Sequence, residues 1–301
     1  MRLALWMFCV FVVVWSELTR AGDISVADVP KDLLGCWQKE QDEGFVLLLE
    51  ARRCKIIEQG QLMVLRAQAE GGTLILGQHG HKLPAEYELK GEGLVIKLKG
   101  EEWRLKRRKE IPAAMNPQPM AFGEAKALGM ARRKAIQEDL AERHKEDQAV
   151  RTDPARRGDM QRIDGDNTAY LKKLVGEQGW IDCDRFGKET SNTAFLIVQH
   201  SGDIPLMMGA LSPIEKDVKS GKLDPQPYAL LFDRIKIFTG EKQRFGTQIG
   251  QGPKGQPVVL PLEDQAKVED FRKEIGLFPL SQYLDIFKQQ TGVEKIEILE
   301  E

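Results

Sequence analysis

A change of hydrophobic periodicity near residue 111 constrains this chain more than any other feature of its sequence. Between residues 33 and 108, short apolar runs alternate with polar positions and are separated by glycine-containing turns. Beyond residue 122 the apolar residues recur at helical spacing, with hardly any strand signal. Alternation with period two is typical of strands with one solvated face, whereas spacings of three and four are typical of amphipathic helices. The 301 residues therefore predict an α+β chain in two segregated domains.

Residues 31–110 are predicted to form the first domain, an antiparallel β-meander or a small barrel. The runs that carry strand signals are residues 45–50, 54–58, 62–67, 73–76, 87–90, 94–99 and 103–106. Close spacing and hairpin turns favour antiparallel pairing of consecutive strands. We expect the side chains of so small a barrel to fill its interior.

Gly35-Cys36-Trp37, at the start of this region, resembles the Gly-x-Trp opening of lipocalin-like barrels. The resemblance covers about 75 residues. It implies that Trp37 closes one end of the barrel and that a basic residue from a late strand covers the indole. Arg104 is the residue that we expect in that place.

Three prolines, Pro112, Pro117 and Pro119, mark residues 111–122 as a linker or a strap. Residues 123–291 then form the predicted all-α domain, and residues 292–301 an acidic tail. The first helix of the all-α domain, predicted over residues 123–151, carries only a thin apolar stripe and is expected to be largely exposed.

The remaining helices are predicted from their capping signals. Asp164 is expected to cap a helix over 164–176, and Thr190 with Ser191 to cap the central one. Asp203, followed by Pro205, is expected to open the next helix, which Pro213 should kink or divide. Further helices are expected over 226–239, 262–275 and 281–290.

A set of short motifs in this second domain resembles a bacterial domain family of unknown function. The motifs are Glu-Asp-Gln-Ala-Val-Arg at 146–151, Asp164 with Asn167-Thr168, Gly179-Trp180, Val198-Gln199-His200 with Asp203 and Pro205, Tyr228 with Asp233-Arg234, and Gln243 with Phe245-Gly246-Thr247-Gln248. The resemblance spans residues 125–290. It implies an outline and candidate positions, and it implies no reaction.

His200 is the best candidate for acid–base chemistry, because imidazole titrates near neutral pH. Its predicted place at the C-terminus of a helix favours the protonated form. Asp203, three residues later, is expected to orient the ring. The alternative is a structural histidine that caps the helix end or holds Gln199 and a loop in place.

Further polar residues are candidates for ligand binding if they converge in the helical domain. They are Asp147, Gln148, Asn167, Gln199, Arg234, Gln243 and Thr247. The glycine-rich segment 243–256 either packs as structure or borders a cleft, and we expect His200 to lie beside Thr247. No cofactor motif is present, and the histidines are too few and too scattered to predict a metal site.

The N-terminus has the pattern of a secretory signal peptide. Arg2 supplies a positive start, residues 3–15 form a short apolar core, and Thr19-Arg20-Ala21 fits a cleavage site. We expect cleavage after Ala21 and a periplasmic or extracellular protein, with an uncleaved N-terminal membrane anchor as the alternative. Export permits disulfides, and Cys36 with Cys54 is the expected pair.

Two functions of different classes follow from these observations. The first is a binding or interaction module of the cell envelope, with an unknown small molecule or an envelope protein as its partner. The second is an enzyme in which His200 acts as general acid or base and the polar residues named above bind substrate. A near-neutral balance of 44 Lys and Arg against 46 Asp and Glu argues against nucleic acid.

Overall fold

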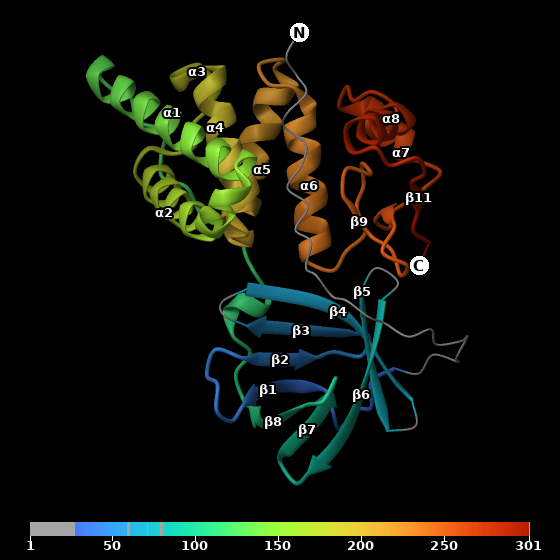
Figure 1. Ribbon diagram of the computed structural model, residues 1–301. Coiled ribbons are helices and arrows are strands. Elements are labelled where there is room, and N and C mark those ends of the chain that lie inside the picture. Colours follow the sequence, from blue (N-terminus) through green and yellow to red (C-terminus); the bar gives the residue numbers. More distant parts are fainter. Residues whose placement is uncertain (1–27, 59–60, 71, 79–80, 301) are drawn as a thin grey trace. The chain divides into compact units, whose positions relative to one another are not determined.

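We describe the protein from a computed structural model, over residues 28–58, 61–70, 72–78 and 81–300 (Figure 1). The chain forms two compact units. The barrel unit contains the described residues up to Pro117, together with Lys236–Val268 and the chain from Leu280 onward. The helical unit contains Gln118–Ile235 and Glu269–Pro279. The predicted signal peptide and Cys9 lie outside the described residues.

An eight-stranded antiparallel barrel occupies the N-terminal part of the chain, as predicted. Its strands are β1 (Gly35–Lys39), β2 (Val46–Leu49), β3 (Arg53–Glu58), β4 (Gln61–Glu70), β5 (Thr73–Gln78), β6 (His81–Lys90), β7 (Gly93–Leu98) and β8 (Glu101–Arg108). Each strand pairs with its neighbour in sequence, and β1 also pairs with β8, which closes the barrel (Figure 1). β1 was missing from the predicted strands, because its side chains alternate poorly.

Apolar side chains fill the interior of the barrel, as expected for its size. The cluster contains Trp37, Phe45, Leu47, Leu74 and Ile96, all almost completely buried. Alternate residues of the same strands face outward, and most of those in the later strands are charged. Burial of one face of every strand fixes the register, because a slip by one residue would turn each apolar side chain outward.

Trp37 is covered by an arginine of the last strand, but the residue is Arg107 and not Arg104. The Arg107 guanidinium carbon lies 4.2 Å from the centre of the indole ring. Its nitrogens donate to the backbone oxygens of Leu34 at 2.9 Å and Asp32 at 2.6 Å. Arg104 pairs with Glu102 at the surface. Arg107 stands directly opposite Trp37 in the β1–β8 register, which the sequence motif could not reveal.

The predicted disulfide between Cys36 and Cys54 is absent, and both are free cysteines. Cys54 belongs to the cluster inside the barrel, whereas Cys36 packs outside it, with Val46 and Leu48. β2 pairs with both cysteine-bearing strands and so lies between them. The two thiols therefore face opposite sides of the barrel wall, where no bridge can form.

The proline-containing segment acts as a strap. Its 3-10 helix, η1 (Ala113–Met115), buries Met115 completely against the outer cluster of Cys36, Val46, Leu48 and Ile57. Later parts of the barrel unit add a small three-stranded sheet, which the sequence patterns did not indicate. It consists of β9 (Ile249–Gln251), β10 (Pro257–Val259) and β11 (Glu297–Ile298), the last within the predicted acidic tail.

The C-terminal region is mainly helical, as predicted. Its helices are α1 (Met130–Thr152), η2 (Pro154–Asp159), α2 (Met160–Gln178), α3 (Cys183–Phe186), α4 (Lys188–Ser201), α5 (Ile204–Lys219), α6 (Pro225–Phe238), α7 (Val268–Glu274) and α8 (Leu280–Thr291). Asp203 caps α5 as expected, accepting from the Leu206 N–H.

Two predicted helix caps were wrong, and one helix is not divided where a division was one alternative. Asp164 lies within α2 and does not cap it, because α2 begins directly after η2. Gly187 precedes α4, so Thr190 and Ser191 are inside that helix. α5 runs through Pro213 as one helix.

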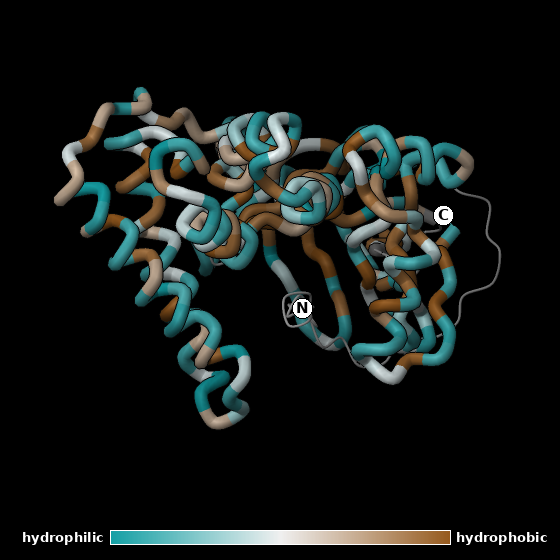
Figure 2. Tube along the Cα trace, turned by 90° about the horizontal axis from the view of Figure 1, so that it is seen from above, coloured by the Kyte–Doolittle hydropathy of each residue, from teal (hydrophilic) through white to brown (hydrophobic). Residues whose placement is uncertain are grey.

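Hydrophobic and hydrophilic positions interleave along the trace of both units (Figure 2). Within the described residues, every helix is too short or too polar to cross a membrane.

Candidate functional site

Three helices of the helical unit, α1, α2 and α4, pack against one another and bring four ionisable side chains together. α4 is buried on all sides from Ala194 to Val198, so it forms the centre of the unit. His200 follows these apolar residues in the last turn. Asp147 and Arg151 come from α1 and Asp164 from α2. We call Asp147, Arg151, Asp164 and His200 the Asp–His cluster.

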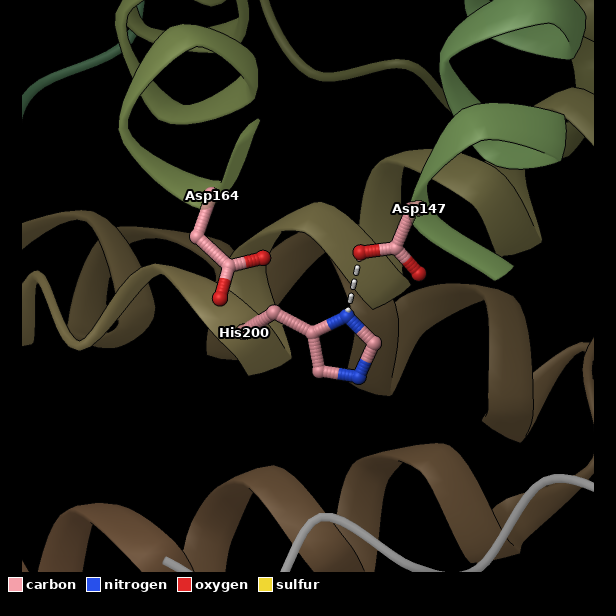
Figure 3. A group of neighbouring side chains, drawn as sticks. All are labelled: Asp147, Asp164 and His200. Carbon is pink, nitrogen blue, oxygen red and sulfur yellow. Dashed lines mark hydrogen bonds and ion pairs between the residues drawn. The ribbon is translucent and has the colours of Figure 1, made fainter. Parts of the chain in front are cut away.

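His200 and Asp147 form the central contact of this cluster. The Nδ1 atom of His200 lies 2.9 Å from an Asp147 carboxylate oxygen, and the two side chains are 10% and 3% exposed. Figure 3 shows the other ring nitrogen, Nε2, pointing away from both carboxylates. No residue within the described ranges forms a hydrogen bond with Nε2. The ring is therefore held through one nitrogen and open at the other.

Arg151 connects the two carboxylates. Its guanidinium donates to Asp147 through Nε at 3.1 Å and Nη2 at 2.9 Å, and Nη2 also donates to Asp164. The sequence suggests an ordinary i, i+4 helix pair of about 0.3–0.5 kcal/mol. The side chain of Arg151 is only 10% exposed, so this pair is largely desolvated and holds two helices together.

Burial and hydrogen bonding set the charges of the central pair. Burial opposes ionisation of Asp147, but the hydrogen bond and charge of His200, and then those of Arg151, lower the pKa of this carboxyl to about 2. Burial lowers the pKa of His200, and the Asp147 carboxylate only partly opposes this. Near neutral pH the pair therefore consists of a carboxylate and a neutral imidazole that donates Nδ1–H. The expectation from the helix dipole, a favoured imidazolium, was wrong because burial outweighs it.

Asp164 titrates differently from Asp147. Burial raises the pKa of Asp164 to about 6, the Arg151 charge opposes the rise, and the Asp147 carboxylate adds to it. Asp147 and Asp164 bind the same guanidinium, yet one has a pKa below that of an ordinary aspartic acid and the other a pKa above it. The cluster can take up a proton at Asp164 near pH 6 while Asp147 stays ionised.

Two carboxylates and an imidazole are also suitable ligands for a divalent cation. One ligand atom each from Asp147, Asp164 and His200 lies within 4.8 Å of the others. However, the guanidinium of Arg151 already binds both carboxylates, and Nδ1 is engaged with Asp147. A cation would therefore compete with this arginine for the carboxylates.

Asp203 does not orient His200, contrary to the sequence-based expectation. One of its carboxylate oxygens accepts from the Leu206 N–H at 2.9 Å, and the other pairs with Lys172 at 2.6 Å. Capping α5 turns this side chain toward the start of its own helix. Asp147, 53 residues earlier in the chain, takes the orienting place instead.

Arg234 binds Gln199, the residue that precedes His200 in the chain. Arg234 donates through Nη1 to the backbone oxygen of Gln199 at 2.7 Å. With the Gln199 amide oxygen facing α6, it accepts from Nη2 and Nε of Arg234, both at 3.1 Å. Arg234 therefore fixes the last turn of α4. Asp233 and Arg234, adjacent in the chain, are both buried.

Gln148 and Asn167 are close in sequence to members of the Asp–His cluster. Gln148 follows Asp147 on α1, and Asn167 lies one helical turn after Asp164 on α2. Gln148 donates to the second Asp147 oxygen at 2.7 Å. Asn167 is 4% exposed and accepts from Arg143 at 2.9 Å. Its amide nitrogen is buried and has no acceptor in the described part of the chain. Asn167 thus keeps a donor for a ligand or a water molecule.

Gln243 and Thr247 belong to the barrel unit. The Gln243 amide donates to the backbone oxygens of Gln248 and Leu260 and accepts from the Gln248 N–H, which holds the loop as structure. Thr247 is 4% exposed, and its backbone oxygen accepts from Tyr283. The predicted proximity of Thr247 to His200 stays a prediction.

Comparison with known proteins assigns the helical region to a protein family. Residues 128–296 match the Family of unknown function (DUF6624). The chain belongs to this family. The match covers all four residues of the Asp–His cluster and confirms the resemblance based on the motifs. No curated protein and no solved structure matches the chain.

Proposed function

We propose that the DUF6624 region is an enzyme domain in which His200 acts as general base and then as general acid. The single observation that carries this proposal is the bond between Nδ1 of His200 and Asp147, with Nε2 left open. The same observation favours the catalytic interpretation over the binding module, because a buried carboxylate that fixes the ring tautomer is costly and has a direct use in proton transfer.

Asp147 performs two tasks in this mechanism. As an ionised acceptor it holds the proton on Nδ1, so that the lone pair of the ring lies on Nε2. When Nε2 takes a proton from water or from a substrate hydroxyl, the same carboxylate stabilises the imidazolium. The lowered pKa of His200 keeps the ring in its basic form at neutral pH.

The described residues supply no nucleophile to Nε2. The nearest hydroxyl in sequence, Ser201, donates to the Val198 backbone oxygen and accepts from the Asp203 N–H. The base therefore acts directly on water or on a substrate group. Arg151 and Asp164 position Asp147, and the buried amide of Asn167 is available to hold substrate.

The tautomer gives a test that needs no substrate. Nitrogen-15 NMR of the histidine side chains at pH 7 should show His200 neutral, with the proton on Nδ1. An imidazolium at this pH, or a proton on Nε2, would contradict the mechanism.

Activity gives the second test, in a panel of ester, amide and phosphoester substrates. His200→Ala should lower any activity found by about 10²-fold or more, while the protein stays folded at a reduced unfolding midpoint because buried Asp147 loses one hydrogen bond. His81→Ala, in the barrel unit, is the matched control and should keep full activity. A His200→Ala protein that unfolds many degrees earlier and retains its activity would assign the residue to structure.

We also propose that the barrel is lipocalin-like and that the protein is exported. The closed eight-stranded meander, the buried Trp37 and the Arg107 guanidinium over its ring support the first part. The sequence pattern of residues 1–21 supports the second. N-terminal sequencing of the mature protein tests export, and a chain that starts at Met1 would contradict cleavage.

A further inference from the structure

A strongly basic groove lies within the barrel unit. Its volume is about 830 Å³, in the range of small-molecule sites. The groove is lined by β3 and β4 on one side and by the segment around residues 236–244 with Pro261 and Glu263 on the other. Six cationic side chains line it against two carboxylates, although the whole chain has a net charge of −2.

The two carboxylates are already used by two of the cations. Glu241 pairs with Lys236 at 2.5 Å, and Glu263 pairs with Arg244 at 3.1 Å. Arg52 pairs with Asp28, which does not line the groove. Arg53 and Lys242 form no ion pair with any residue of the described chain, and both side chains are exposed. With six cations against two carboxylates, the groove therefore has an excess of positive charge, and Arg53 and Lys242 are the cations outside its ion pairs.

Arg53 also faces another arginine. It stands directly opposite Arg66 in the register of β3 and β4. Their neighbours Cys54 and Leu65 point into the barrel, so the two arginines share its outer face. This register places two positive charges at one point of the outer face, next to the other cations that line the groove.

We propose that this groove binds a small phosphorylated molecule through its phosphate group. Guanidinium groups donate two parallel hydrogen bonds to phosphate oxygens, and phosphate offers more charge and more acceptors than a single carboxylate. Arg53 gives the bidentate donor from β3, and Lys242 adds a point charge from the segment around residues 236–244. This site is independent of the proposed chemistry at His200.

Inorganic pyrophosphate is the probe, titrated calorimetrically into the full-length protein at low ionic strength. The wild type should bind it saturably, and Arg53→Gln/Lys242→Gln should weaken binding by about tenfold or more, because two charge-assisted contacts are lost. Both side chains are exposed, so the variant should keep the wild-type unfolding midpoint.

Lys106→Gln/Lys109→Gln is the matched control, since it removes two exposed positive charges that do not line the groove. It should bind pyrophosphate like the wild type. An equal loss of affinity in both variants would mean that only the net charge of the protein matters, and it would overturn the proposal. A wild type that does not bind pyrophosphate would also overturn it. Citrate binding as tightly as pyrophosphate would overturn the assignment of phosphate.

Discussion

The two units of this protein treat charge in opposite ways. The barrel buries an apolar core and keeps its charged side chains on the outer face, where Arg104 and Glu102 pair in solvent. The helical unit buries Asp147 almost completely, pairs it with the Arg151 charge and gives it a hydrogen bond from His200. Exposed pairs contribute little to stability, whereas a buried charge is costly once its partner is removed. The comparison shows that substitutions of charged residues should be tolerated on the barrel surface and costly in the Asp–His cluster.

Removing the central carboxylate should give the largest effect. Asp147→Ala removes one of the two carboxylates that bind the buried Arg151 and leaves the His200 Nδ1–H without its acceptor, so the free energy of unfolding of the helical unit should fall by about 3–5 kcal/mol. Urea denaturation followed by circular dichroism measures this. Asp166→Ala is the matched control, because Asp166 is exposed on α2 and should change stability by less than about 0.5 kcal/mol. A similar effect of the two substitutions would mean that Asp147 is not an integral part of the packed unit.

A pH-dependent difference should follow from Asp164, whose pKa is raised to about 6. Its folded form binds more protons than its unfolded form between about pH 4 and 6. The wild type should therefore lose about 1–3 kcal/mol of stability relative to Asp164→Asn as the pH rises through that window. The lowered pKa of His200 makes stability rise with pH instead. This contribution is present in both proteins, so it does not affect the difference between them.

Denaturation curves of the two proteins at pH 4, 5, 6 and 7 test this difference. A constant difference across the series would show that Asp164 ionises normally in the folded state.

The smallest effect is expected in the barrel. Arg107→Ala removes the cation over Trp37 and two hydrogen bonds to backbone oxygens, so it should cost about 1–2 kcal/mol at this exposed site. Arg104→Ala removes only a surface pair and should cost less than about 0.5 kcal/mol. Thermal unfolding followed by tryptophan fluorescence compares them. If Arg104→Ala were the more damaging change, the assignment of Arg107 as the cover would be wrong.

The barrel could be predicted from sequence because its determinants are local. Strand alternation and hairpin turns indicate neighbour pairing, and seven of the eight strands were indicated in this way. β1 was missed because its burial pattern does not alternate. The choice of Arg107 over Arg104 depends on the register between the first and last strands, which no local pattern determines.

The Asp–His cluster could be predicted only in part because its contacts are long-range. His200 and Asp147 were both among the candidate residues, but Asp203 was expected beside the ring on the basis of its nearness in sequence. Asp164 was expected as a helix cap and Arg151 as half of a surface pair. Helix periodicity shows that Asp147 and Arg151 share a face, but it does not show which side chain of α4 that face meets.

Closure of the barrel by its first strand has a consequence for how the chain tolerates truncation. β1 pairs with both β2 and β8, so deleting Gly35–Lys39 would leave two strands with unpaired backbone groups. Such open edges recruit strands from other molecules and promote aggregation. Removal of the residues before Gly35 would keep all eight strands but take Val29 and Leu33 from the core, whereas removal of β1 as well would open the barrel into a sheet with two unpaired edges.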